Sequence, residues 1–189
     1  MTGTRKRLQK ANDESPAKAA GFTLIELMIV LAIAGLALTL AIPAFQEMTG
    51  RQQLNTAAAD LLHAIQLTRS EALRRNRTVR LAPLDDADWT QGWRIYVGSG
   101  ESGPYRDGDR LILQRTALPA GLRIENRSGA PPEIHIAYNG GGRSVRRNGM
   151  RLANSWYLRW KEETRIIVVN AQGRVRICDP ARDHGRCER

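Results

Sequence analysis

The sequence predicts an α+β protein in which one long N-terminal helix packs on a C-terminal antiparallel β domain. Three observations support this fold class. Residues 22–45 are apolar almost throughout, residues 46–76 carry apolar side chains three and four positions apart, and residues 77–177 consist of short alternating stretches separated by turn residues. The first pattern indicates a membrane helix, the second an amphipathic helix, and the third an antiparallel sheet.

The apolar segment 22–45 is long enough to cross a membrane, but it contains one acid, Glu26. As a helix it extends about 36 Å, compared with a hydrocarbon core of about 30 Å. A cleaved secretory signal has a shorter apolar run, followed by a small-residue cleavage site. A plain membrane anchor fits the length but leaves Glu26 without a partner, and a carboxylate inside a membrane costs free energy.

From Gln46 the pattern becomes amphipathic and predicts that the same helix continues to about residue 76. The residues expected on its buried face are Leu54, Ala58, Leu61, Leu62, Ile65, Thr68, Ala72 and Leu73. Charged and polar residues occupy the other face, so this half is expected to pack on the globular domain. The cations of the stretch RRNR suit the C-terminal end of a helix.

Beyond Asn76 the chain reads as strands and turns. The expected strands are TVRLAPL, GWRIYVG, DRLILQRT, RIEN, EIHIAYN, YLRWK, RIIVVN and RVRIC. Glycine-rich breaks such as GGGR and NAQG separate several of them. We assign Trp156, Tyr157 and Trp160 to the sheet and not to a ligand site.

The charge is concentrated near the C-terminus. The net charge is +10, and residues 143–189 hold 12 basic and 5 acidic side chains. A basic surface attracts nucleic acid or anionic lipid, whereas an arginine-rich genome would explain the excess of arginine over lysine equally well.

Cys178 and Cys187 lie in a C-terminal tail, residues 178–189. Two such thiols would stay free in the cytosol, and in an exported domain a disulfide is expected to close the tail. Only His184 lies nearby, so the spacing predicts no zinc site.

The stretch GFTLIELMIVLAIAG resembles the class III signal of type IV pilins and pseudopilins. The resemblance implies that residues 1–21 are a leader, that prepilin peptidase cleaves after Gly21, and that Phe22 is then methylated. Glu26 becomes the fifth residue of the product, where this family carries an acid. Its implied partner is the terminal ammonium of a neighbouring subunit, which neutralises the carboxylate during assembly.

The stretches LLHAIQLTRSEALRRNRTVRL, GWRIYV, DGDRLI, LPAG and AYNGGGR are similar to the GspH/FimT family of minor pilins and pseudopilins. This resemblance implies a type IV pilin-like fold and partnership with prepilin peptidase, other pilin subunits and the inner membrane. It also implies a single pass through the inner membrane, a periplasmic globular domain, and incorporation into a pilus or pseudopilus exposed at the cell surface.

No motif predicts catalysis. The sequence contains no nucleotide-binding loop, no HExxH and no GxSxG. His63 and His135 are expected on the helix surface and in a strand, and Asp107 and Asp109 in a turn. We therefore expect no catalytic residue, no metal and no cofactor.

The C-terminal stretch TRIIVVNAQGRVRIC predicts a hairpin that turns at Gly173. In its second strand Arg174 and Arg176 share one face, while Val175 and Ile177 share the other. The apolar pair is expected to pack inward, which leaves two guanidinium groups side by side and exposed.

Members of the FimT branch of the family carry a Gly-Arg-x-Arg motif implicated in binding DNA during natural transformation, and here Gly173, Arg174 and Arg176 match it. Phosphate contact is the expected mechanism, and 3–4 phosphates give a salt slope of about −2.7 to −3.6. Further candidates are Arg143, Arg146, Arg147, Arg182 and Arg186. The alternative is a purely structural subunit that primes or caps a type IV pilus, as FimU-like relatives do, or a GspH-like subunit of a type II secretion pseudopilus.

Overall fold

The structure is a computed structural model that describes residues 23–85, 87–98, 104–128, 134–183 and 186–188. The chain divides into two compact units, Met1–Pro43 and Ala44–Arg189. The helix α1 (Leu24–Arg75) supplies residues to both units. The expected leader, residues 1–21, and the expected methylation site Phe22 lie outside the described residues.

In the first unit, α1 begins with a capping box. The Thr23 backbone N–H donates to Glu26 Oε2 (2.9 Å), and the Glu26 N–H donates to Thr23 Oγ1 (3.3 Å). The apolar side chains that follow are exposed, and the helix is long and apolar enough to cross a membrane by length and composition. The sequence therefore predicted the helical state of this segment correctly.

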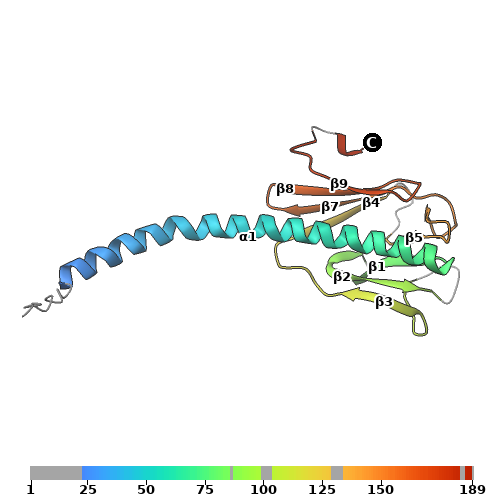
Figure 1. Cartoon of the computed structure of the whole chain (residues 1–189), viewed down its shortest axis with the longest axis horizontal. Coiled ribbons are helices and arrows are strands. Elements are labelled where there is room, and N and C mark those ends of the chain that lie inside the picture. The colour runs from blue at the N-terminus through green and yellow to red at the C-terminus, as the bar shows by residue number, and fades with distance from the viewer. Residues whose placement is uncertain (1–22, 86, 99–103, 129–133, 184–185, 189) are drawn as a thin grey trace, which may run out of the picture. The chain divides into compact units, whose positions relative to one another are not determined.

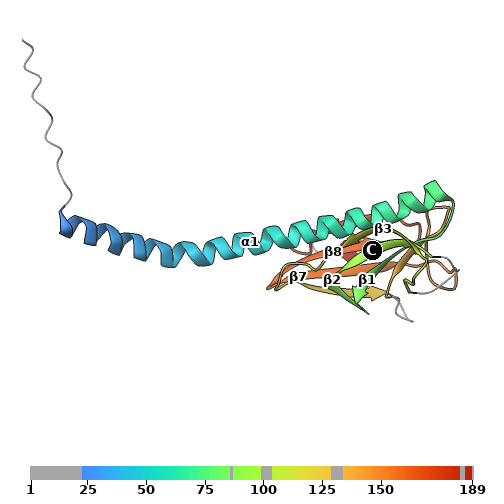
Figure 2. The same ribbon diagram turned by 90° about the horizontal axis from the view of Figure 1, so that it is seen from below.

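In the second unit, α1 buries one face against the β domain (Figures 1 and 2). Its buried residues are Gly50, Leu54, Ala57, Ala58, Leu61, Ala64, Ile65, Thr68 and Ala72. Leu73 was expected on this face but is 50% exposed. It lies in the last helical turn, where its Cδ2 atom is 3.0 Å from the position that a Cβ on Gly142 would take.

One sheet has five antiparallel strands in the order β3-β2-β1-β5-β6. Its strands are β1 (Val79–Asp85), β2 (Asp88–Val97), β3 (Arg110–Arg115), β5 (Ile136–Tyr138) and β6 (Ser144–Val145). Four of them coincide with expected strands, and β6 is too short to leave an alternating pattern in the sequence.

The second sheet has four antiparallel strands in the order β4-β7-β8-β9. They are β4 (Arg123–Ser128), β7 (Asn154–Trp160), β8 (Glu163–Val169) and β9 (Val175–Cys178). All four were expected. The short 3-10 helix η1 (Arg186–Glu188) follows in the tail.

Both sheets and the second half of α1 contribute to one hydrophobic core. Trp89 of β2 and Trp156 of β7 meet there edge to face, with ring centroids 5.5 Å apart. Trp156 is fully buried, and Trp160 is partly buried against the same core, so the assignment of these two rings to the sheet is confirmed.

Candidate functional site

The C-terminal end of α1 forms one wall of the arginine-rich region. Asn76 adopts a positive φ of 48°, and the Asn76 and Arg77 N–H groups donate to the Leu73 and Ala72 carbonyls, both at 3.3 Å. This is a Schellman motif with asparagine in the place usually taken by glycine. A Cβ on Gly140 would lie 2.5 Å from Asn76 Oδ1, so only glycine allows the following loop to approach the helix end this closely.

That loop is the first turn, Asn139–Arg143, which joins β5 to β6. The Asn139 side-chain oxygen accepts hydrogen bonds from the Gly141 and Arg143 N–H groups, both at 3.1 Å. The Asn139 N–H donates to the Arg143 carbonyl (3.1 Å), and the Gly142 N–H donates to the Asn139 carbonyl (2.8 Å). Gly142 has a positive φ of 68°, which the tight turn requires.

The second turn, Asn170–Arg174, joins β8 to β9 and repeats this arrangement bond for bond. The Asn170 side-chain oxygen accepts from the Gln172 (3.1 Å) and Arg174 (2.9 Å) N–H groups. The Asn170 N–H donates to the Arg174 carbonyl (3.0 Å), and the Gly173 N–H to the Asn170 carbonyl (2.8 Å). Gly173 has a φ of 80°, so the predicted hairpin and its positive-φ glycine are confirmed.

The two turns touch each other. A Cβ on Gly173 would lie 2.5 Å from the Gly142 carbonyl oxygen and 2.7 Å from the Tyr138 ring. The hydroxyl of Tyr138, a buried residue directly before the first turn, donates to the Gly173 carbonyl (3.2 Å). Two loops from different sheets therefore form one locked unit that carries Arg143 and Arg174.

Sequence reasoning treated these stretches separately. The missed signal was the shared spacing Asn-x-x-Gly-Arg, present as NGGGR at 139–143 and as NAQGR at 170–174. An Asn side chain that accepts from the backbone two residues on is a common turn device, and the glycine supplies the positive φ.

Burial along β9 departs from the expected alternation, because Arg176 and Ile177 are both exposed and Cys178 is buried. Val175 packs against the main core, whereas Ile177 is 38% exposed, because β9 is the edge strand of its sheet. The expectation that Ile177 packs fully inward was wrong.

Arg174 and Arg176 are both exposed, as expected, but only one of the two guanidinium groups is open. Arg174 is exposed and precedes β9, and its side chain makes no hydrogen bond or ion pair with any described residue. The Arg176 guanidinium instead donates to the carbonyls of Arg186 and Cys187, both at 3.2 Å, and is thereby tied to the tail.

The additional candidate arginines also differ in whether their side chains already have partners within the protein. Arg143 is exposed, and its side chain contacts no hydrogen-bonding or charged partner among the described residues. Arg146 and Arg147 are engaged within the protein. Arg182 pairs with Asp179 at 3.6 Å, and Arg186 is exposed next to the tail disulfide.

The tail is folded back on β8 and β9. Cys178 and Cys187 form the disulfide that was expected for an exported domain, with their Cα atoms 5.5 Å apart. With Tyr157 and Ile166 they form a second small hydrophobic cluster, separate from the main core.

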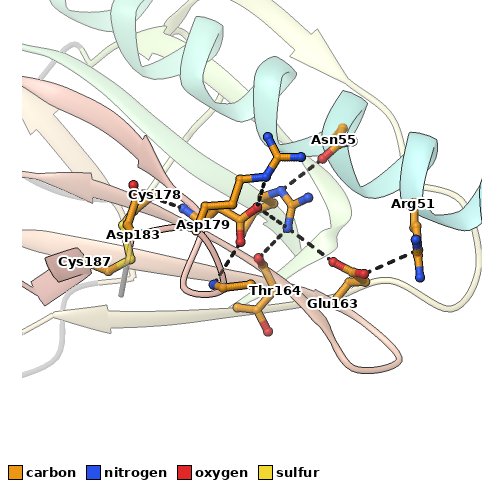
Figure 3. Close-up of polar contacts among 11 residues, drawn as sticks. Arg51, Asn55, Glu163, Thr164, Cys178, Asp179, Asp183 and Cys187 are labelled. Carbon is orange, nitrogen blue, oxygen red and sulfur yellow. Dashed lines mark hydrogen bonds and ion pairs between the residues drawn. A yellow bond between two sulfur atoms is a disulfide. The ribbon is translucent and has the colours of Figure 1, made fainter. Parts of the chain in front are cut away.

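Charged side chains connect the tail to α1 (Figure 3). Arg165 Nη1 lies 3.3 Å from Asp179 and 3.5 Å from Glu163, and Arg165 Nε donates to Asn55 of α1 (3.1 Å). Arg51 of α1 reaches Glu163 at 3.3 Å. The chain therefore holds the start of its tail against the helix through Arg165.

Cys178, Asp183 and Cys187 bring three potential metal-ligating atoms within 4.8 Å of one another. The two sulfur atoms are bonded to each other, so they are not available as thiolate ligands. The arrangement does not suit a metal ion while the disulfide is intact.

An open hollow of about 800 Å³ lies between α1 and β3, lined among others by Asp60, His63, Trp93 and Arg115. Asp60 is paired with Arg115, whose guanidinium lies 5.3 Å from the Trp93 ring centroid. His63 is exposed on the helix, as expected.

With this geometry established, comparison with known proteins gives the family. Residues 57–182 match the family described as Type II transport protein GspH, and residues 16–42 match the prokaryotic N-terminal methylation motif. The chain belongs to the GspH family. It is therefore a minor pilin or pseudopilin, a class of structural subunits not known as enzymes.

Several known proteins are similar to this GspH-family chain. A fimbrial protein of Pseudomonas aeruginosa is 36% identical over 85 residues, which cover 43% of this chain and 55% of that protein, so the chain matches about half of that relative's length. The pilin-like protein PilA1 of Thermus thermophilus is 26% identical over 159 residues, 83% of this chain and 97% of its own length.

Among solved structures, the type IV minor pilin FimU of Pseudomonas aeruginosa covers 71% of this chain and 95% of its own, with 20% identity and a TM-score of 0.53. This likeness confirms the fold class, a long helix packed on antiparallel sheets as in type IV pilins. Membership of the FimT branch in particular does not follow from these comparisons.

Proposed function

We propose that this chain is a minor type IV pilin that binds DNA without sequence preference through the arginine-rich region near its C-terminus, and so aids DNA uptake in natural transformation. The candidate residues are those of the Gly-Arg-x-Arg motif, Gly173, Arg174 and Arg176, together with the neighbouring basic side chains. The observation that carries the proposal is the exposed Arg174 on a turn fixed by four hydrogen bonds, without a partner among the described residues.

The chemistry is phosphate contact. A guanidinium group offers a planar fork of N–H donors that matches phosphate oxygens. In α1 the side chains of Arg74 and Arg75 are paired with Glu71, and the tryptophans of the described β domain are held in or against the core. Binding of this kind depends steeply on salt and little on base sequence.

The experiment is duplex-DNA binding by the full chain in neutral detergent over a salt series. The wild type is compared with the double variant Arg174→Ala/Arg176→Ala. We expect weaker binding and a shallower salt slope, by about 0.9 for each phosphate contact that the variant loses. Equal binding by both proteins would place the site elsewhere on the basic surface.

A second candidate function is that of a purely structural minor pilin or pseudopilin, in a type IV pilus or in a type II secretion system. Its support is the FimU-like fold together with the apolar helix. For this function the arginines of the turns are replaceable. Absence of DNA binding by the wild type at low salt would favour this candidate.

The N-terminal features complete the proposal. Prepilin peptidase cleaves after Gly21, Phe22 is methylated, and the Glu26 carboxylate meets the terminal ammonium of a neighbouring subunit. The capping box supplies Glu26 with local donors, so the charge has a partner before assembly as well. Mass spectrometry of the mature chain tests the first two statements, since an N-terminal N-methylphenylalanine is expected.

The same proposal places the protein across the inner membrane, with residues 46–189 in the periplasm and, after assembly, in a filament exposed at the cell surface. The disulfide agrees with an oxidising compartment. Protease digestion of intact spheroplasts, followed by detection of the globular domain, tests this orientation.

A further inference from the structure

We propose that the two turns form one two-armed phosphate site, in which Arg143 and Arg174 hold neighbouring phosphates of one DNA strand, and that Arg176 is mainly a structural residue. The inference rests on the proposed function, because it names the residues that would carry DNA binding. It differs from the sequence motif, which joins Arg174 to Arg176.

The first argument is the partners of each guanidinium group. Arg143 and Arg174 are exposed and form no side-chain hydrogen bond or ion pair with the described residues. Arg176 donates to two carbonyls of the tail, and Arg182 pairs with Asp179. A guanidinium group that already holds internal partners has fewer N–H groups left for a phosphate.

The second argument is the rigidity of the two arms. Arg143 and Arg174 are each the last residue of an Asn-x-x-Gly-Arg turn, and their own N–H groups donate to the side-chain oxygens of Asn139 and Asn170. The turns are further locked by their close contact at the two glycines. Both arginine backbones are therefore held in place before a ligand arrives, which lowers the entropy lost on binding.

The third argument is the charge beneath the turns. Arg69 Nε of α1 lies 3.3 Å from the position of a Cβ on Gly142, is itself buried, and has no hydrogen-bond partner among the described residues. Its positive charge therefore lies directly below the first turn. A phosphate held by Arg143 would lie in the field of this third guanidinium group.

The fourth argument is the absence of acids in the surrounding sequence. Residues 134–161 and 164–178, which contain both turns, hold no aspartate or glutamate. The arginines of an ordinary solvated surface are usually interspersed with acids of opposite sign. The two turns instead combine positive charges that no acid of their own segments neutralises.

The test distinguishes a site formed by Arg143 and Arg174 from one formed by Arg174 and Arg176. Duplex DNA of random sequence is titrated with the full chain in neutral detergent, using the single variants Arg143→Ala, Arg174→Ala and Arg176→Ala. Arg123→Ala is the matched control, since Arg123 is also exposed but lies on β4, at the opposite edge of the sheet from β9. Melting temperatures confirm that each variant is folded.

We expect Arg143→Ala and Arg174→Ala each to weaken binding about tenfold and to lower the salt slope by about 0.9. The double variant Arg143→Ala/Arg174→Ala should lower the slope by about 1.8. Arg176→Ala should bind DNA like Arg123→Ala but melt at a lower temperature, because its guanidinium holds the tail. Arg143→Lys should retain the slope, since the charge remains.

Two results would overturn the inference, and they are distinguishable. If Arg174→Ala and Arg176→Ala weaken binding while Arg143→Ala matches the control, the site is the linear motif and the proposed function survives. If the wild type binds no DNA even at low salt, the proposed function fails together with the inference.

Discussion

The hydroxyl of Tyr138 donates a hydrogen bond to the carbonyl oxygen of Gly173, 3.2 Å away. Tyr138 ends β5 in one sheet, whereas Gly173 lies in the turn before β9 in the other. The hydrogen bond therefore connects the two turns, and the Gly142 and Gly173 backbones also lie in close contact. The separation of Arg143 and Arg174 depends on this contact.

Replacing Tyr138 by phenylalanine tests the contribution of this hydrogen bond to stability. We expect Tyr138→Phe to lower the free energy of unfolding by about 1 kcal/mol, since the Gly173 carbonyl loses its donor while the ring still fills the core. Urea denaturation measures the change. Tyr105→Phe is the control, because the Tyr105 hydroxyl has no hydrogen bond with the described residues. An equal loss of unfolding free energy in both variants would show that the Tyr138–Gly173 hydrogen bond does not stabilise the fold.

Alkaline conditions should weaken the same region. Burial raises the pKa of the Tyr138 hydroxyl above its usual value, and the nearby Arg69 offsets this only in part. A group whose pKa is raised on folding stabilises the fold below its unfolded pKa, about 10 for tyrosine, and this contribution is lost as the pH rises further. Unfolding free energy should therefore fall above about pH 10, with a smaller slope in Tyr138→Phe. A pH series of urea titrations checks this, and identical slopes would refute it.

The contact between the turns predicts different costs for two glycine substitutions. Gly173 and Gly149 both have a φ near 80°, but a Cβ on Gly173 would meet backbone and the Tyr138 ring, whereas one on Gly149 would meet nothing within 4 Å. Gly149→Ala should cost only backbone strain, about 1 kcal/mol. Gly173→Ala should cost about 2–4 kcal/mol and should also weaken DNA binding. Thermal denaturation compares the two, and equal costs would mean that the turns separate without penalty.

Much of the fold could be predicted because it rests on local pattern. The spacing of Leu54, Leu61 and Ile65 identified the buried face of α1, and alternation identified eight of the nine strands. Exposure at the edges could not be predicted in this way. Leu73 and Ile177 follow the pattern of buried residues, yet one lies in the last helical turn and the other on an edge strand, where the covering layer ends.

The candidate site was predicted in composition but not in arrangement. The hairpin at Gly173 and the disulfide follow from local signals and from the expected compartment. The meeting of the two turns is set by the packing of two sheets on α1, and no local pattern encodes it. The partners of Arg176 lie in the tail, ten and eleven residues further along the chain. The alternation in β9 predicted the exposure of Arg176 but could not predict these hydrogen bonds.

Removal of the buried Arg165 should cost more unfolding free energy than removal of the exposed Arg51. The side chains of Arg165 and Asp179 are only 16% and 17% exposed, whereas Arg51 is 59% exposed. Arg165→Ala should destabilise the protein by about 2–3 kcal/mol, because it leaves the Asp179 carboxylate poorly compensated. Arg51→Ala, which also removes a cation paired to an acid of this network, should cost less than about 0.5 kcal/mol. Urea titration of both variants measures the two changes in unfolding free energy. The double variant Arg165→Ala/Asp179→Asn should recover part of the stability that Arg165→Ala loses.

Reduction of the disulfide should loosen the tail without unfolding the β domain. Cys178 and Cys187 are the only cysteines, so a reductant acts at this bond alone. The closed loop of ten residues contributes about 2.7 kcal/mol in the chain-entropy model. We expect a lower melting temperature in reductant and faster proteolysis after Arg182 or Arg186, while Cys178→Ser/Cys187→Ser should be insensitive to reductant. The main core does not include either cysteine. The fluorescence of the buried tryptophans should therefore stay native-like in the reduced protein at moderate temperature. Loss of that signal on reduction would show that the tail is needed for the fold of the whole domain.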